Sequence, residues 1–202
     1  MTVITVLGID PSLTHTGYVV ADVDCETRKI VKIHIHKTIV TAPTKNKKVR
    51  KSSDALERAR SIAKTLRAVI AEHNIKLATS EVPSGAQSAN ACYAFGISVG
   101  ILASLPVPVI ELNPSEVKLA ACGSKVADKE DIVRWAVDMT STAGGHEHWN
   151  TTKAANDWEI TIDGKYVTKT MEHQADAIAG VKAAADSEQF RQLAGVLLSM
   201  LG

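Results

Sequence analysis

The sequence predicts one α/β domain built on a five-stranded mixed sheet, with a three-strand antiparallel meander followed by two parallel strands. Three observations support this prediction. Residues 1–40 hold three β-branched segments separated by short turns, the later apolar segments alternate with helical ones, and 202 residues suffice for one full core but hardly for two. We expect a single domain over residues 1–202, with helices flanking the sheet and a β-hairpin in an added segment at residues 142–170.

The first three segments have the composition of strands. Residues 2–9 are short, apolar and β-branched, which is typical of a buried strand, and residues 16–24 predict a second one. In "IVKIHIHKTIV", residues 30–40, apolar and polar residues alternate. We therefore expect a half-exposed strand with Ile33 and Ile35 on one face and with His34 and His36 on the other.

The remaining elements alternate between helix and strand. Residues 54–73 place Leu56, Ile62 and Leu66 on one helical stripe, and Asp54 and Glu57 have the spacing of a capping box. A short strand then ends at Glu81. Further helices are expected at 86–105, 114–121, 127–139 and 171–185, a strand at 107–112, and a last amphipathic segment to 201.

The composition limits the classes of function. The net charge is +1, so affinity for a polyanion has to come from local clusters of Lys and Arg. Three widely spaced cysteines argue for a reducing compartment and against a disulfide framework or a zinc motif. No secretory signal and no membrane-spanning apolar run stand out. We therefore expect a cytoplasmic protein without a membrane partner.

Four acidic or imidazole residues occupy the ends or faces of predicted elements. Asp10 ends the first strand, Glu81 ends the fourth, and His173 and Asp176 share one face of a predicted helix. Taken singly, each is more often an ordinary turn, cap or solvated residue. If the helix packs beside the two strands, however, the four converge into a site suited to Mg²⁺ or Mn²⁺. Two such ions can catalyse phosphodiester hydrolysis.

Four segments follow the order and spacing of a known family. They are "LGIDPSLTHTGY", "SEVPSGAQSANACYAFGISVG", "NPSEVKLAACGSKVADKEDIV" and "EHQADAIAG", and they resemble the RuvC-type Holliday-junction resolvases over most of residues 3–184, apart from 142–170. The resemblance implies a ribonuclease-H-like fold and a crossover junction endodeoxyribonuclease. It also implies a homodimer that cuts four-way DNA junctions with two Mg²⁺ or Mn²⁺ ions per site and no nucleotide cofactor. The divergence leans towards a phage or other viral member.

The resemblance assigns roles by position. Asp10, Glu81 and Asp176 match three of the family's four metal-binding carboxylates. His173 falls at the fourth position, where the family usually has Asp and sometimes His. Imidazole suits Mn²⁺ better than Mg²⁺, and it could instead orient the attacking water. Lys118 and Lys129 match basic residues that approach the DNA phosphates near the site.

Two departures from the family stand out. Ser84 occupies the position where bacterial members carry an aromatic side chain that stacks on bases at the junction centre. Because such stacking contributes ~1–3 kcal/mol, we expect a weaker or altered sequence preference. The added segment holds "HEHWN" and, at Asp163-Gly164, a hairpin turn. We interpret it as a surface loop and hairpin, with metal binding or base stacking through His146, His148 and the Trp as the alternative.

Two further surfaces are candidates for DNA and for a second subunit. The best candidate for other phosphate contacts is a basic run, alone most often a solvated loop, that comprises Lys45, Lys47, Lys48, Arg50 and Lys51. The small-residue-rich helix at 86–105 is the candidate dimer interface, with burial in the monomer core as the alternative. A two-fold symmetric dimer would place two active sites on the two-fold symmetric junction.

Three other functions are compatible with parts of the sequence. The actin, Hsp70 and sugar-kinase fold uses a similar strand–turn–strand to bind phosphate, but it needs two such domains, and the sequence shows no second copy. A ribonuclease-H-like nuclease for other branched DNA or for RNA–DNA hybrids would use the same site residues. A junction-binding module that does not cut is disfavoured, because clustered carboxylates without a metal repel one another.

Overall fold

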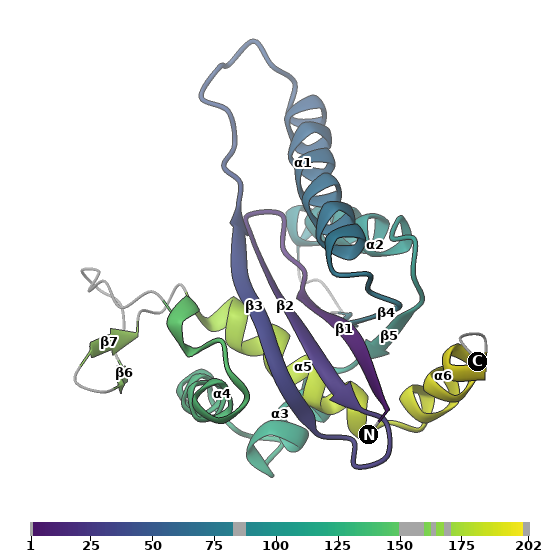
Figure 1. Cartoon of the computed structure of the whole chain (residues 1–202). Helices are drawn as coiled ribbons and strands as arrows, with labels where there is room; N and C mark the ends of the chain where they lie inside the picture. The colour runs from purple at the N-terminus through teal and green to yellow at the C-terminus, as the bar shows by residue number, and fades with distance from the viewer. Residues whose placement is uncertain (1, 83–87, 150–159, 163–164, 168–170, 200–202) are drawn as a thin grey trace.

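The chain folds around one mixed sheet with helices on both faces (Figure 1). The computed structural model describes residues 2–82, 88–149, 160–162, 165–167 and 171–199. The main sheet has the order β3-β2-β1-β4-β5. Its strands are β1 (Val3–Asp10), β2 (His15–Asp24), β3 (Ile30–Val40), β4 (Leu77–Glu81) and β5 (Val109–Leu112). The helices are α1 (Lys51–Glu72), α2 (Ala89–Ala103), α3 (Pro114–Cys122), α4 (Lys129–Ala143), α5 (Glu172–Asp186) and α6 (Glu188–Ser199), with a short 3₁₀ turn η1 (His146–His148).

The strand pairing confirms the predicted meander and the two parallel strands. β1 pairs antiparallel with β2, and β2 pairs antiparallel with β3. β4 joins β1 in parallel, with Ile9 opposite Ser80, and β5 joins β4 in parallel. Because the carboxyl ends of parallel neighbours lie at the same end of a sheet, Asp10 and Glu81, the last residues of β1 and β4, lie at the same edge.

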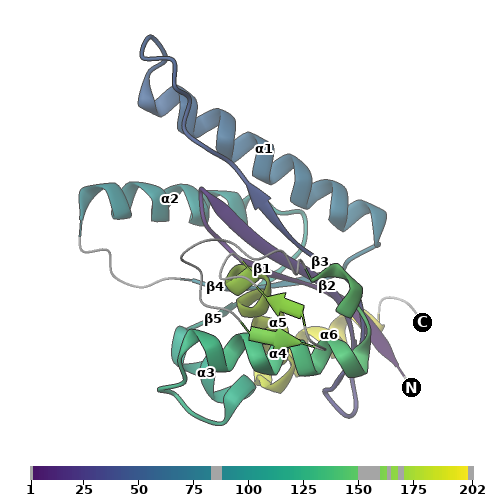
Figure 2. The ribbon, with the colours of Figure 1, turned by 90° about the vertical axis from the view of Figure 1, so that its left-hand side faces the viewer.

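Two helical layers enclose the sheet (Figure 2). α1 and α2 cover one face, where they pack on Leu7 and Ile9 of β1. α3, α4 and α5 lie on the opposite side, where the core includes Ile4 and Val6. Since side chains alternate along a strand, Asp10 points to the same face as Ile4 and Val6, towards α5.

α5 lies directly against the backbone of the sheet. At Gly8 of β1 a Cβ atom would come within 2.4 Å of the carbonyl oxygen of Ala177, so no larger residue fits without a shift. The helix itself is rich in small residues, and Ala175, Ala179 and Gly180 are buried against its neighbours. This close approach brings the first turn of α5 next to the end of β1.

The start of α1 differs from the prediction. The helix begins at Lys51, its N-cap is Arg50, and no side chain caps it. The expected capping box at Asp54 is therefore wrong: Asp54 lies inside the first turn, and its carboxylate accepts a hydrogen bond from the backbone N–H of Thr44. Leu56, expected on the buried stripe, is 50% exposed because it faces a groove between α1 and α2.

A β-bulge changes which residues of β3 point inwards. Val20 pairs with Ile35 and Ala21 pairs with Ile33, so His34 is the extra residue between two ladder positions. The strict alternation fails there, and Ile33 and His36 both face the α5 layer. The prediction that His36 lies on the exposed face is wrong, since His36 is 0% exposed.

The added segment is only partly as expected. Strands β6 (Ile160–Ile162) and β7 (Lys165–Val167) pair antiparallel, as the predicted hairpin requires, while its turn at Asp163-Gly164 lies outside the described residues. The interpretation of "HEHWN" as a surface loop is wrong for Trp149, which is buried in the core and donates from Nε1 to the Thr140 hydroxyl at 2.7 Å. Within the described ranges, no helix is both long and apolar enough to cross a membrane.

Candidate active site

The turn after β1 holds Asp10 at the end of the sheet. It is closed by local hydrogen bonds, among them one from the Thr16 hydroxyl to the carbonyl of Ser12. Arg58 of α1 braces the turn from outside, since its guanidinium donates to the carbonyl of Leu13 and to the Thr41 hydroxyl, both at 2.8 Å. The carboxylate is thus presented by a turn tied to a neighbouring helix.

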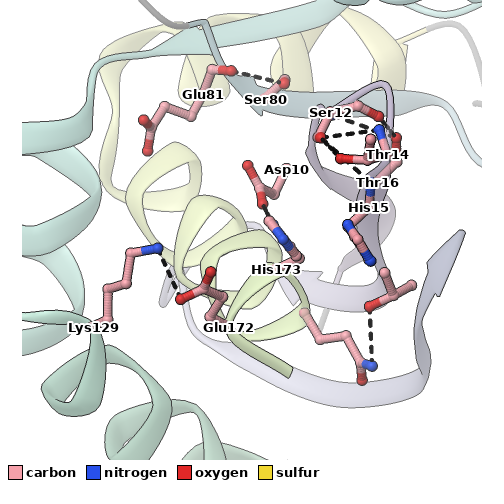
Figure 3. A network of polar contacts seen from close by, with 12 residues as sticks. Asp10, Ser12, Thr14, His15, Thr16, Ser80, Glu81, Lys129, Glu172 and His173 are labelled. Atoms are coloured by element: carbon pink, nitrogen blue, oxygen red, sulfur yellow. Dashed lines mark hydrogen bonds and ion pairs between the residues drawn. The ribbon is translucent and has the colours of Figure 1, made fainter. Parts of the chain in front are cut away.

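His173 meets Asp10 directly (Figure 3). Its Nδ1 lies 2.6 Å from Oδ2 of Asp10, and both side chains are less than one-quarter exposed. Burial alone would lower the pKa of His173, but the hydrogen bond to Asp10 and the charge of that carboxylate outweigh burial and raise it. The imidazole of His15 lies parallel to that of His173, with ring centroids 5.6 Å apart.

Glu81 and Asp176 complete a group of coupled carboxylates. Burial, and then the negative charge of Asp10, raise the pKa of Glu81, while Lys118 acts in the opposite direction. Burial together with the charges of Asp10 and Glu81 raises the pKa of Asp176 to about 7. The three carboxylates, far apart in sequence, therefore repel one another across a shared site.

Two lysines border this site. The residues that line a cavity of about 180 Å³ include Glu81 and Asp176 as well as Lys118 and Lys129. The ammonium group of Lys129 lies 2.8 Å from Oε2 of Glu172, the residue before His173. Partial burial would lower the pKa of Lys129, but the hydrogen bond to Glu172 and its charge outweigh burial and raise it. Both lysines thus line the same cavity as the carboxylates, and their contact with DNA phosphates stays a prediction.

The carboxylates of the site are suitable ligands for a hard divalent ion, but the side chains are not arranged in a coordination geometry. In the described part of the chain, no three His, Cys, Asp or Glu side chains form a group that could hold a metal ion. Part of the reason is chemical: one oxygen of Asp10 is engaged by His173. Coordination of a metal ion by Nδ1 of His173 would require that hydrogen bond to open, whereas the other oxygen of Asp10 is not engaged by it.

The other predicted site residues lie elsewhere. Ser84 is outside the described residues. The residues of the basic run are all exposed, and the run follows β3, whose end at Val40 pairs with His15 near the turn after Asp10. His148 is not near the carboxylates: its Nε2 contacts the carbonyl of His34 at 3.1 Å. His146 contacts the Ser141 hydroxyl through Nδ1 at 3.0 Å.

Sequence reasoning missed three residues of the site. Glu172 was inside the quoted "EHQADAIAG" block, but without the fold nothing distinguished it from a solvated helix residue. His15 was inside the first block and became visible only through its stacking on His173. Gln174 could not be identified from pattern, since its partner His36 was expected to point outwards.

The chain is similar in sequence to proteins of one known family. The family described as "Crossover junction endodeoxyribonuclease RuvC" matches residues 6–141. The chain belongs to the RuvC family. Among similar RuvC proteins, that of Synechococcus sp. (strain CC9311) is 32% identical over 131 residues, which cover 63% of this chain and 79% of that one. The RuvC protein of Parasynechococcus marenigrum (strain WH8102) is 32% identical over 131 residues, or 63% and 78% of the two chains.

Solved RuvC structures confirm the predicted fold class. Thermus thermophilus RuvC in complex with a Holliday junction substrate superposes with a TM-score of 0.65 at 22% identity, covering 94% of this chain and 96% of that one. The yeast mitochondrial Holliday junction resolvase Ydc2 gives 0.57 at 15% identity, covering 94% and 78%. Asp10, Glu81, Lys118 and Lys129 lie within the RuvC family match, whereas the α5 residues lie beyond its end at residue 141.

Proposed function

We propose that this chain is a metal-dependent endonuclease that resolves four-way DNA junctions by paired, symmetric nicks. The supporting observation is the electrostatic coupling of Asp176 on α5 to Asp10 at the end of β1 and Glu81 at the end of β4, in a RuvC-family fold. The relatives carry the name crossover junction endodeoxyribonuclease, and the Thermus relative was solved with a Holliday junction substrate. We treat residues 1–202 as one nuclease domain and residues 142–170 as an element added to it.

The electrostatics of the site favour a divalent cation. Three partly buried carboxylates repel one another, and the raised pKa values of Glu81 and Asp176 express that repulsion together with the cost of burial. A divalent cation would offset both effects, and carboxylate oxygens are suitable ligands for Mg²⁺ and Mn²⁺. When bound, two such ions supply an activated water and stabilise the leaving oxygen of the phosphodiester.

Each residue of the site then has a defined task. Asp10, Glu81 and Asp176 hold the ions. His173 donates to Asp10 in the metal-free protein; if that bond opened and the Nδ1 proton passed to solvent, Nδ1 would be available as a nitrogen ligand or as an acceptor that orients the attacking water. A nitrogen ligand favours Mn²⁺ relative to Mg²⁺.

The lysines provide the contact to the scissile strand. Lys118 and Lys129 line the cavity next to Glu81 and Asp176, where a backbone phosphate would lie close to the carboxylates. Lys129 is held by Glu172 without DNA, so a phosphate would compete with that carboxylate for the ammonium group. Such charge-assisted contacts position the strand and offset the charge that develops during hydrolysis.

We further propose a homodimer formed through α2. The helix is apolar and small-residue-rich, yet much of it is exposed, including Tyr93, which is 49% exposed, and Val99. Leu56 of the neighbouring helix α1 is exposed as well. Beside it runs a groove of about 600 Å³ between α1 and α2 with an apolar floor that includes Ala59, Ile97 and Ile101. We assign this groove to helix α2 of a second copy of the chain, because a two-fold dimer matches the two-fold symmetry of a four-way junction.

The test is cleavage of a labelled synthetic junction with Mg²⁺, Mn²⁺ or EDTA. We expect paired nicks with either metal and none with EDTA. Asp10→Asn should abolish cutting and leave junction binding largely intact, while Asp138→Asn, on an exposed part of α4, should cut like the wild type. Cutting by the Asp10 variant at the wild-type rate would refute the site. Preferential cutting of replication forks or RNA–DNA hybrids would refute the proposed substrate but leave the nuclease assignment in place.

A further inference from the structure

His36 is a polar residue buried entirely in the interior, between three segments of the chain. Its Nδ1 lies 2.5 Å from Oε1 of Gln174, in the first turn of α5. Its Nε2 lies 2.9 Å from the carbonyl oxygen of Gly145, in the turn that follows α4. The indole of Trp149 lies against the same ring, with centroids 4.3 Å apart. One imidazole in β3 thus joins the ends of two helices to the sheet.

The hydrogen-bond chain extends from β3 to α5 through a second strand residue. The amide nitrogen of Gln174 lies 3.2 Å from the hydroxyl oxygen of Thr38. With the amide in this orientation, the ring donates to Gln174 and to Gly145 and is an imidazolium. Turning the amide by 180° lets Thr38 donate to the amide oxygen and the amide donate to Nδ1, which completes the chain with a neutral ring. Burial lowers the pKa of His36 and so favours the neutral form.

Gln174 directly follows His173, and this adjacency links the buried chain to the candidate site. Successive residues of a helix point about 100° apart around its axis. His173 is bound to Asp10 of β1, and Gln174 is bound to His36 and Thr38 of β3. Two anchors in different directions hold the rotation of the first turn, and Met171, which precedes it, contributes no side-chain cap.

We propose that His36 is a positioning residue of the nuclease site: through Gln174 it holds the rotation of the first turn of α5 and so keeps His173 and Asp176 aimed at Asp10. The proposal rests on the proposed function. The hydrogen bonds of His36 go to Gln174 and Gly145 and not to the four proposed ion-holding residues, so it acts only by orienting α5. The loss of such an orienting partner behind a metal site typically lowers metal affinity or activity about 10- to 100-fold.

The experiment compares His36→Phe, Gln174→Met and the double variant. Phe fills the space of the ring but removes both hydrogen bonds, and Met removes the amide. We expect each single variant to lower the single-turnover cleavage rate about 10-fold or more, with the junction dissociation constant within about two-fold of the wild type. If His36 acts through Gln174, the double variant should be no slower than the slower single variant. Multiplying effects would overturn the proposal.

A matched control separates positioning from general destabilisation. Phe190→Leu in α6 weakens the same core cluster away from the site, and it should lower the thermal midpoint without lowering the cleavage rate below that midpoint. Calorimetric titration of Mn²⁺ into the DNA-free proteins gives a readout that does not depend on cleavage. We expect weaker binding for His36→Phe and unchanged binding for Phe190→Leu.

The two proposals fail in different ways. If the wild type cuts junctions and His36→Phe cuts equally fast with equal Mn²⁺ affinity, the positioning role is overturned and the nuclease assignment remains. If the wild type cuts neither branched DNA nor RNA–DNA hybrids, the nuclease assignment fails. The nitrogen and proton chemical shifts of the His173 imidazole then decide whether His36 orients α5, since a positioning role requires them to change in His36→Phe and not in Phe190→Leu.

Discussion

A Cβ atom on Gly17 would lie 1.9 Å from the carbonyl oxygen of His173, so β2 and the first turn of α5 touch backbone to backbone. Gly17 is also the partner of Asp10 across the β1–β2 ladder. The residue opposite the strand-end carboxylate in the sheet is therefore the residue on which the histidine-bearing turn rests. The short distance between Asp10 and His173 therefore depends on Gly17 having no side chain.

Gly17→Ala should therefore damage the site more than the fold. The added methyl group has to push the first turn of α5 away, because its nearest contacts are backbone atoms of His173. We expect a loss of about 1–3 kcal/mol in the free energy of unfolding and at least a ten-fold slower cleavage of junction DNA. Gly195→Ala in α6 is the matched control: a Cβ there meets nothing within 4 Å, so this change should leave cleavage unaltered and stabilise slightly. Equal cleavage by both variants would contradict the close approach.

The pKa of Asp176 predicts a stability cost in the metal-free protein. The folded-state pKa of about 7 lies above the ordinary value of 3.8, so the folded protein favours the protonated carboxyl. The contribution of this group to the free energy of unfolding is therefore fully present below about pH 3.8 and is lost as the pH rises through about 7. In EDTA, Asp176→Asn should be more stable than the wild type at pH 8, on the order of 1–4 kcal/mol, with a smaller advantage at pH 5. Urea denaturation at both pH values measures this. If the stability difference between Asp176→Asn and the wild type does not grow with pH, the pKa of Asp176 is not raised in the folded protein.

The α2 surface predicts the state of association. Tyr93→Glu places a charge on the exposed apolar face of α2 and should convert a dimer into a monomer in sedimentation velocity experiments. Val196→Glu changes an equally exposed apolar residue on α6 and should leave the dimer intact. The monomeric variant should produce single rather than paired nicks. If the wild-type chain sediments as a monomer, both alone and with junction DNA, the proposed dimer through α2 is refuted.

The basic run predicts a change in salt dependence. Its exposed residues lie between the end of β3 and the first residue of α1 (Figure 1). Replacing Lys45, Lys47 and Lys48 with Ala should weaken junction binding and reduce the slope of log K against log salt by up to about 2.7, at about 0.9 per lost phosphate contact. Lys29 and Lys32, near the opposite end of β3, provide a control pair for which the slope should not change. Equal slopes in all three proteins would place the run outside the DNA interface.

The sheet could be predicted because its patterns are local. Three β-branched segments in succession, an acidic residue at the end of a strand, and helical stripes between strands needed no knowledge of distant contacts. Asp10, Glu81, His173 and Asp176 could be grouped because two lie at strand ends and two lie three residues apart on a helix. Asp176 is coupled electrostatically to Asp10 and Glu81, while the hydrogen bond between His173 and Asp10 could not be foreseen from spacing.

The errors arose where tertiary structure overrides a local period. His36 was assigned to the exposed face because alternation was assumed to be unbroken, and the bulge at His34 reverses that assignment. Asp54 was assigned to a cap because its spacing to Glu57 is correct, but α1 starts earlier and the carboxylate binds Thr44. Trp149 was placed at the surface because its neighbours are polar, yet the core continues under the turn after α4.

The bulge at His34 means that the interior of this enzyme depends on the length of a strand as well as on its composition. If His34 instead occupied a ladder position and the strand alternated strictly, Ile33 and His36 would lie on opposite faces of the sheet and could not both face α5, although every proposed ion-holding and phosphate-contacting side chain would still be present. A protein engineer who transplanted only those side chains onto another scaffold would omit the extra residue that lets Ile33 and His36 share one face of the sheet.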